Sequence, residues 1–362
     1  MSDRRVRALA VGYQGFGNVG DEAILAGIGR LLAGTPVTIT TVVGGDRAVI
    51  PACRDAVRIT GRRVLPGLRA LRALRRSDAL ILSGGGLIHD HWPIVVPQYL
   101  AWVAAARLLG CRVAWVGVGI GPLRRRHSRF LAGLALRMSH VVLIRDEGSA
   151  ALARLIGGRV TAVIPDPAFF LAPPEQASHA PARALLGIVI REPLAGTADA
   201  DQFLEAIAAA ATDQHARHGR SARVFTFAGA RDDAYAARLA TLLAERGVPA
   251  TVEPLTPDPD AAMAALAQCE VLLTIRLHGI ILGSVVGVPW ATVSYDSKVA
   301  AIAAYLEAQD LAVPLPSVDG PALIAALDEA VTPGRVAALA ARRVAILETR
   351  STVSDALRDA LA

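Results

Sequence analysis

Short runs of apolar, often β-branched residues alternate with longer stretches of helical periodicity along almost the whole chain. The apolar runs are continuous, which is typical of parallel strands that are buried on both faces. Strands that alternate with helices predict parallel sheets covered by helices. The strands predicted in the first half are 7–12, 37–43, 56–60, 78–83, 112–118, 140–144 and 159–164. The helices predicted between them are 21–33, 66–76, 94–109, 126–137 and 148–156.

The stretch 171–183 interrupts this alternation, because it contains three prolines and no periodicity; such a stretch predicts a linker. The alternation restarts with strands at 185–191, 222–227, 249–253, 270–275 and 290–294. Helices are predicted at 200–217, 232–246, 258–267, 278–287 and 297–307, and a long helix over 335–360. We therefore expect an α/β protein with two Rossmann-like domains and a long C-terminal helix. The expected ranges are 1–172 and 184–334 for the domains, 173–183 for the linker and 335–362 for the terminal helix.

Composition narrows the class of protein. Of the 362 residues, 53% are apolar and 19% are charged, which excludes a disordered chain. No stretch of about 20 apolar residues runs without interruption, so we expect no transmembrane helix. Three cysteines lie far apart, which argues against a disulfide framework or a zinc site and favours a reducing compartment. With no cleavable apolar segment at the start, the sequence predicts a cytoplasmic protein.

The basic residues are almost all arginine. Of 38 lysines and arginines, only Lys298 is a lysine. A lysine retained in such a background indicates that a compact ammonium group is needed there. Chance retention is the alternative.

Ligands of doubly wound sheets bind where loops leave the carboxyl ends of strands. The first such loop, 12–22 (GYQGFGNVGDE), carries G-x-G-x-x-G at Gly15, Gly17 and Gly20, with Asp46 at the end of the next strand. This is the pattern of a dinucleotide site. However, the Asp21–Glu22 pair would repel a pyrophosphate, whereas it suits a helix start or a sugar hydroxyl. We therefore expect that Asp46 contacts no ribose. A capped glycine turn is the alternative.

The second loop, 83–93 (SGGGLIHDHWP), places three glycines after a buried strand and then His89, Asp90, His91 and Trp92. Exposed backbone amides followed by polar groups and an indole suit a sugar site. Three consecutive polar residues do not point to one metal centre, and local capping is the alternative. The glycines of the loop 117–122 allow close approach of the backbone.

Later loops supply cations. Arg145 follows an apolar strand, which suits an anion site or a pair with a neighbouring carboxylate such as Asp146. Arg276 and His278 are alternate residues with apolar flanks, so that both need partners if buried. A bound phosphate would offset the charge of Arg276 and leave His278 able to donate a proton. Lys298 follows one strand and one helix later, at the same predicted sheet edge.

Seven segments, in order, resemble blocks of the polysaccharide pyruvyl transferase family, over roughly residues 7–310. They are GYQGFGNVGDEAIL, GGGLIHD, VGVGIGPL, LIRDEGS, PDPAF, IRLHGIILG and VSYDSKV. The chain is most similar to the bacterial branch that pyruvylates cell-wall polysaccharide precursors. His89 departs from that branch, where we expect glutamine, and this leaves the identity of the acceptor open.

The resemblance implies a glycosyltransferase-B-like fold and a transferase of polysaccharide biosynthesis. Phosphoenolpyruvate would be the donor, a sugar diol of a cell-wall or exopolysaccharide precursor the acceptor, and a cyclic ketal and phosphate the products, with no cofactor and no metal. His278 would be the general acid and Asp21 the second catalytic residue. Residues at donor-binding positions are Arg145, Arg276, Leu277 and Lys298. Residues at acceptor-binding positions are Asn18, Gly84, Gly85, Gly86, His89 and Asp90.

Two arginine-rich stretches suggest a partner. One contains Arg58, Arg62, Arg63, Arg69, Arg72, Arg75 and Arg76, and the other Arg124, Arg125, Arg126 and Arg129. They predict a docking surface for anionic lipid and a lipid-linked acceptor at the inner face of the membrane, with a solvated basic face as the alternative. Only 4% of the residues are aromatic and no nucleic-acid-binding module is recognised, which argues against nucleic acid.

Three other functions remain open from the sequence alone. One is a nucleotide-sugar-dependent glycosyltransferase of the same two-domain fold, and another is an NAD-dependent oxidoreductase that uses the first glycine loop. The third is a sugar-binding scaffold without activity. Neither the oligomeric state nor the bridged hydroxyls follow from the sequence.

Overall fold

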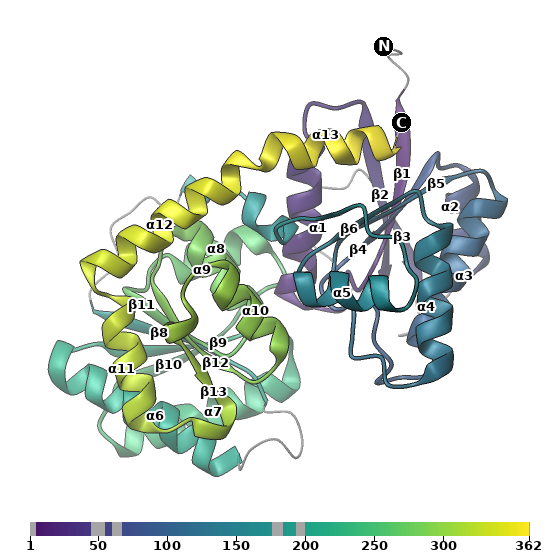
Figure 1. Ribbon diagram of the computed structural model, residues 1–362. Helices are drawn as coiled ribbons and strands as arrows, with labels where there is room; N and C mark the ends of the chain where they lie inside the picture. Colours follow the sequence, from purple (N-terminus) through teal and green to yellow (C-terminus); the bar gives the residue numbers. More distant parts are fainter. Residues whose placement is uncertain (1–4, 45–54, 60–66, 176–183, 193–199, 362) are drawn as a thin grey trace. The chain divides into compact units, whose positions relative to one another are not determined.

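The computed structural model describes residues 5–44, 55–59, 67–175, 184–192 and 200–361 (Figure 1). The chain divides into two compact units. Unit 1 comprises Met1–Leu171 and Glu348–Ala362, and unit 2 comprises Ala172–Leu347. Each unit contains one parallel sheet with helices around it. Most of the predicted linker lies outside the described residues, as do Asp46, Arg62 and Arg63.

The sheet of unit 1 has seven strands in the order β3-β2-β1-β4-β5-β6-β7. They are β1 (Val6–Val11), β2 (Val37–Gly44), β3 (Asp55–Ile59), β4 (Ala79–Ser83), β5 (Arg112–Val118), β6 (Val141–Ile144) and β7 (Ala162–Val163). The chain runs outward from β1 to β3, crosses back to β4 beside β1, and then runs outward again to β7. The order therefore reverses between β1 and β4, and the loops that follow these two strands are neighbours.

The helices that connect the strands of unit 1 in its described residues are α1 (Val19–Leu31), α2 (Leu68–Arg75), α3 (Val95–Leu108), α4 (Arg126–Met138) and α5 (Glu147–Leu155). Right-handed crossovers place α1 on one face of the sheet and α2 to α5 on the other, as Figure 1 shows for α1 and for α2 to α4. A 3-10 turn, η1 (Pro167–Phe170), packs against α1.

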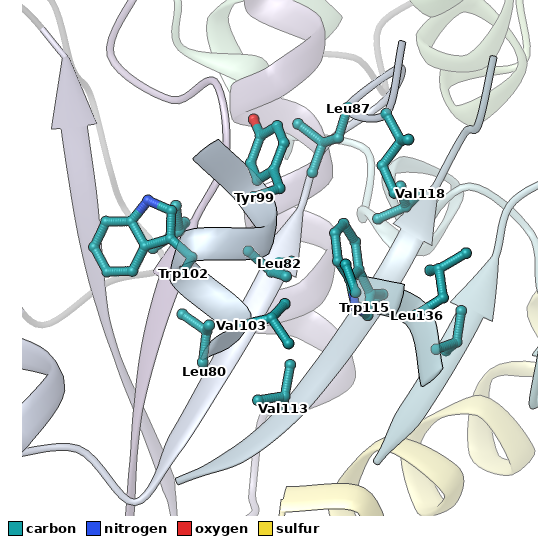
Figure 2. Close-up of a cluster of buried hydrophobic side chains, with 14 of the residues drawn as sticks. Leu80, Leu82, Leu87, Tyr99, Trp102, Val103, Val113, Trp115, Val118 and Leu136 are labelled. Atoms are coloured by element: carbon teal, nitrogen blue, oxygen red, sulfur yellow. The ribbon is translucent and has the colours of Figure 1, made fainter. Parts of the chain in front are cut away.

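An aromatic core fills the space between α3 and the sheet (Figure 2). Trp102 of α3 and Trp115 of β5 are fully buried. The indole Nε1 of Trp115 donates a hydrogen bond of 2.7 Å to Ser139 Oγ, so that this buried donor is satisfied. The cluster also contains Leu87, in the loop that carries the three glycines. The core thus supports the loop between β4 and α3 from beneath.

The sheet of unit 2 has six strands in the order β10-β9-β8-β11-β12-β13. They are β8 (Leu185–Ile190), β9 (Ser221–Thr226), β10 (Ala250–Pro254), β11 (Val271–Thr274), β12 (Trp290–Ser294) and β13 (Ala312–Pro314). The helices are α6 (Ala200–His218), α7 (Ala230–Glu245), α8 (Pro259–Leu266), α9 (Leu277–Val286), α10 (Ser297–Tyr305), α11 (Gly320–Ala330) and α12 (Pro333–Glu348), whose last residue is counted with unit 1. The reversal here falls between β8 and β11.

The structure confirms two Rossmann-like domains with a terminal helical segment and adds detail. The segment is broken at Thr349 into α12 and α13 (Arg350–Leu361). The predicted strand 159–164 shortens to β7, whereas β13 and α11 were not predicted. Asp319 caps α11 by accepting from the N–H of Ala322 at 2.8 Å, and Pro321 lies in the first turn of this helix. An aspartate followed by a proline is a typical signal for a helix start.

Helix α13 packs on unit 1, although it follows unit 2 in the chain. Arg112 Nε of β5 donates to the carbonyl oxygen of Ala360 at 2.6 Å, and Ser354 Oγ donates to that of Leu31 at 2.5 Å. Leu357 is fully buried. The last helix is therefore part of the fold of unit 1.

Two features of the described residues concern the expectations of no transmembrane helix and no disulfide framework. None of their helices is long and apolar enough to cross a membrane. Cys111 and Cys269 are buried free thiols.

We expect Leu357→Ala to destabilise unit 1 by about 2–5 kcal/mol, because it removes a fully buried side chain. Hydrogen–deuterium exchange should show faster exchange in β5 and α1. Leu155→Ala is the matched control, since Leu155 is 79% exposed in the same unit. Equal exchange in the two variants would show that α13 does not contribute to the stability of unit 1.

Candidate functional site

In unit 1, the loops that follow β1, β4 and β5 are joined by hydrogen bonds. Gln14 is fully buried, and its Nε2 donates to Ser83 Oγ at 3.0 Å. The N–H of Gly119 donates to the carbonyl oxygen of Gly85 at 2.6 Å. A Cβ at Gly12 would lie 1.9 Å from the carbonyl oxygen of Ser83, so only glycine allows this approach. The three loops form one wall at the carboxyl edge of the sheet.

Asp21 is the central titratable group of this edge. Asn18 caps helix α1, and its Nδ2 donates to Asp21 Oδ2 at 2.5 Å. Burial raises the pKa of Asp21 to about 6, although Asn18, the backbone N–H of Gly85 and the charge of Arg145 favour the ionised form. A carboxylate that titrates near neutrality suits a general base.

Glu22 has a different role, although it is adjacent to Asp21. Its Oε1 accepts from the N–H of Gly15 at 2.6 Å, and this bond closes the glycine loop onto the helix. Burial raises the pKa of Glu22 to about 7, and the charge of Asp21 adds to the shift. Within the acidic pair, Glu22 therefore fixes the loop after β1, and Asp21 is the candidate site residue.

Arg145 lies at the end of β6 and forms a buried ion pair. Its Nη1 lies 3.1 Å from Asp166 Oδ2, and its Nε lies 3.9 Å from Asp146 Oδ2. Asp166 also accepts from the N–H of Ala168 at 3.0 Å. Asp166 belongs to the block PDPAF but is not among the site residues predicted from the sequence. The arginine therefore balances three carboxylates, Asp166 and Asp146 directly and Asp21 at longer range.

The loop 84–90 is held against the loop 117–125. Asp90 is buried, and its Oδ2 accepts from the N–H groups of Arg124 and Arg125 at 2.7 and 2.6 Å. Burial raises the pKa of Asp90, but these two hydrogen bonds outweigh burial and hold the pKa below its usual value. The rings of His89 and His91 lie 5.0 Å apart. Asp90 thus caps local backbone N–H groups, which is the alternative role that the sequence left open for this loop. Gly84 to Gly86 and His89 belong to the same loop.

In unit 2, the carboxyl edge of the sheet is cationic. Arg276 occupies the N-cap position of α9 without a capping hydrogen bond from its side chain, and its guanidinium forms an ion pair with the buried Asp232. Its Nε is buried and has no hydrogen-bond partner among the described residues. A Cβ at Gly279 would lie 2.0 Å from Thr274 Oγ1, so glycine is needed where α9 turns back on β11. Burial lowers the pKa of Arg276, and the negative charge of Asp232 opposes this shift.

Arg191 and Tyr295 complete this edge and were missed from the sequence. Arg191 follows β8, and its Nη1 donates to Tyr295 Oη at 2.6 Å. The guanidinium carbon lies 4.4 Å from the centre of the Tyr295 ring. The charges of both residues act on Arg276. The signal that selected Arg145, an arginine directly after an apolar strand, would also have found Arg191.

Leu277, His278 and Lys298 lie at the starts of two helices on this edge. Leu277 and His278 are the first residues of α9, and His278 is partly buried. Asp296 caps α10 by accepting from the N–H of Lys298 at 3.1 Å. Since β11 and β12 are adjacent, the two helices begin side by side. The predicted proximity of His278 and Lys298 along the sheet edge thus follows from the strand order.

The predicted residues therefore fall into two groups. Asn18, Asp21, the three glycines and Arg145 gather in unit 1, and Arg276, Leu277, His278 and Lys298 gather in unit 2. Arg145, predicted to bind the donor together with Arg276 and Lys298, belongs to unit 1, and its role at the donor stays a prediction. Among the described residues, no cluster of three or more His, Cys, Asp and Glu side chains is arranged to hold a metal ion.

Solved structures with this fold are glycosyltransferases and related enzymes. Anabaena Alr3699/HepE in complex with UDP-glucose is 11% identical with a TM-score of 0.62, over 98% of this chain and 100% of that one. A Rickettsia africae glycosyltransferase is 8% identical with a TM-score of 0.62, over 99% of both chains. UDP-GlcNAc 2-epimerase from Methanocaldococcus jannaschii is 11% identical with a TM-score of 0.61, over 91% of this chain and 93% of that one. At these identities the similarity establishes the glycosyltransferase-B-like fold alone.

Sequence comparison identifies the family. No curated protein matches the chain. The model of the polysaccharide pyruvyl transferase family matches residues 18–297, a range that contains the candidate residues of unit 1 from Asn18 onward and those of unit 2 up to α9. The chain therefore belongs to the polysaccharide pyruvyl transferase family.

Proposed function

We propose that this protein transfers the pyruvyl group of phosphoenolpyruvate to two hydroxyls of a sugar in a cell-wall or exopolysaccharide precursor. The product is a cyclic pyruvate ketal, and phosphate is released. Unit 2 binds the donor and unit 1 binds the acceptor. No cofactor or metal is needed, because the donor is itself activated by protonation.

Protonation of the methylene carbon of phosphoenolpyruvate starts the reaction. The methylene becomes a methyl group, and C2 becomes electrophilic. One sugar hydroxyl bonds to C2, the C2–O bond to phosphate breaks with its electron pair, and the second hydroxyl closes the ring. Of the two hydroxyl protons, one restores the acid and the other leaves with the phosphate. The protein must supply an acid, a base and cations for two anionic groups.

The cationic edge of unit 2 is the observation that carries this proposal. Arg276 and Arg191 lie together at the ends of adjacent strands, and Asp232 is the carboxylate paired with Arg276. A buried guanidinium whose Nε has no partner is costly, and a bound carboxylate or phosphate would complete its hydrogen bonds. Lys298 adds an ammonium at the next helix start. His278, in the first turn of α9, is the acid.

Asp21 is the base for the sugar hydroxyl in this scheme. Its pKa of about 6 means that it is ionised at neutral pH and can still accept a proton. Asn18 and Gly85 orient the carboxylate, and Arg145 positions it through charge while bound to Asp166. Gly84, Gly86 and His89, from the loop between β4 and α3, contact the sugar hydroxyls in this scheme, while the N–H of Gly85 bonds to Asp21.

The overall test is incubation of the purified protein with phosphoenolpyruvate and a panel of lipid-linked and synthetic disaccharide acceptors. Mass spectrometry should detect a gain equal to pyruvic acid minus water, together with phosphate release. UDP-glucose and NAD are the comparison ligands. Transfer of glucose from UDP-glucose, or NAD-dependent oxidation, would replace the proposal with one of the two rival reactions.

We expect His278→Gln to leave phosphoenolpyruvate binding almost unchanged and to lower turnover by about 10²–10⁴-fold, the usual contribution of a general acid. Calorimetry measures the binding, and phosphate release measures the turnover. His218→Gln is the matched control, because His218 is exposed on α6 of the same unit. Normal turnover in the His278 variant would remove the acid assignment.

Lys298→Ala should weaken phosphoenolpyruvate binding by about 10–100-fold, as expected for the loss of a charged hydrogen bond. Lys298→Arg should restore only part of the affinity, because the guanidinium differs in shape and reach. Ser297→Ala, at the neighbouring exposed position, is the control. Full recovery with arginine would mean that any cation is sufficient there.

The pH dependence of kcat/KM should report Asp21. A base must be deprotonated, so activity should fall as the pH drops through about 6. Asp21→Asn should lower activity and abolish this limb of the profile. Glu22→Gln should keep the limb, because glutamine can still accept from Gly15. If the limb disappears in Glu22→Gln and persists in Asp21→Asn, the two roles are reversed.

A further inference from the structure

Three helices of unit 1 begin at the same edge of the sheet. Each of α2, α3 and α4 follows a strand and leads to the next one in the same direction along the sheet, so right-handed crossovers place all three on one face. Their first turns lie at the carboxyl edge, which also carries Asp21 and the glycine loop. Helices α3 and α4 pack against each other. Whatever is exposed at these three helix starts is therefore displayed on one surface.

That surface exposes large apolar side chains. Leu68 is 77% exposed at the start of α2, Trp92 and Ile94 are 69% and 43% exposed before α3, and Phe130 is 64% exposed in the first turns of α4. All four tryptophans of the chain lie in the described residues. Trp102, Trp115 and Trp290 are fully buried, and Trp92 is exposed.

Cations surround these apolar residues. Arg69, Arg124, Arg126 and Arg129 are exposed at the same helix starts. Between residues 56 and 145 the sequence has fifteen arginines and two carboxylates, Asp78 and Asp90. Both carboxylates are engaged, Asp78 with Arg7 and Asp90 with two backbone N–H groups. The described part of this surface therefore carries a positive charge that its own carboxylates do not neutralise.

We propose that this surface, the starts of α2, α3 and α4, binds an anionic lipid bilayer. Arginines attract the negatively charged headgroups, and a tryptophan flanked by aliphatic side chains inserts at the interface. Aliphatic Leu68 and Ile94 favour a bilayer over nucleic acid, which would use aromatic stacking surfaces. This proposal of bilayer binding rests on the exposed side chains of the surface and does not depend on the proposed reaction.

The purpose of this binding rests on the proposed function. Trp92 lies two residues after Asp90, and the carboxylate of Asp90 ties this loop to the backbone at Arg124 and Arg125. The membrane surface therefore borders the proposed acceptor site. It would hold the protein where the sugar head of a lipid-linked acceptor reaches Asp21.

Tryptophan fluorescence provides a direct test on the full-length protein without any substrate. Vesicles of phosphatidylcholine containing phosphatidylglycerol should shift the emission to shorter wavelength, and brominated lipids should quench it. Vesicles of phosphatidylcholine alone should do neither, and added salt should weaken binding. Trp92→Phe should still sediment with anionic vesicles but lose the spectral response, because the remaining tryptophans are buried.

Variants then separate the charged and apolar contributions. Arg124→Gln with Arg126→Gln should weaken vesicle binding roughly 25-fold, about fivefold for each arginine near the surface. Trp92→Ala with Phe130→Ala should weaken sedimentation with anionic vesicles, whereas Trp92→Phe should not. The matched control is Leu155→Ala with Arg159→Gln, which changes an exposed leucine and an exposed arginine at the opposite end of unit 1. Circular dichroism confirms that each variant is folded.

Three results would overturn the proposal. One is equal vesicle binding by the control and the Arg124–Arg126 variant, and another is binding to single-stranded RNA in place of anionic vesicles. The third is a concentration-dependent dimer that buries Trp92. Turnover of a soluble disaccharide is measured separately, so that an inactive protein that still binds vesicles contradicts the proposed reaction and leaves the membrane surface intact.

Discussion

Parallel strands can follow one another only through crossovers, and every crossover returns the chain to the same edge of the sheet. In each unit, the loops after the central strands therefore converge without any specific interaction being required to bring them together. The reversal of strand order between β1 and β4 in unit 1, and between β8 and β11 in unit 2, opens space beside these loops. Asp21 and the three glycines of unit 1, and Arg276 and His278 of unit 2, follow the strands at these reversals, whereas Arg145 follows β6 and Lys298 follows β12 farther along each sheet.

Burial then determines what each loop residue can do. Asp21 and Arg145 are each less than one-tenth exposed, so neither charge is screened by water. Arg145 is paired with Asp166, and burial raises the pKa of Asp21 to about 6, close to neutral pH. In unit 2 the balance is reversed, because two arginines face one another beside a single ion-paired aspartate. One sheet edge is suited to accept a proton, and the other to bind an anion.

The sequence was sufficient for the strands and helices of the core, because their apolar runs and periodicity are local. It also singled out Asp21, Arg276 and His278 as candidates, since chemically distinctive residues in apolar loops are rare, and their roles stay predictions. It could not supply the partners. Gln14 meets Ser83 across 69 residues, Arg276 meets Asp232 across 44, and Arg145 meets Asp166 across 21. Such pairings depend on strand order, which periodicity does not encode. The break at Thr349 escaped prediction for a different reason, because the helical periodicity of α12 continues into α13.

The docking of α13 on unit 1 has a consequence for biosynthesis. Unit 2 occupies a continuous stretch of chain, whereas unit 1 is assembled from both sides of it. During translation, the seven-stranded sheet emerges first but lacks the helix that covers Leu31 and Arg112. Unit 2 can complete its own fold before that helix has been synthesised, so the first unit to emerge is the last to be finished. Until then, nascent unit 1 carries an open apolar face that chaperones would recognise.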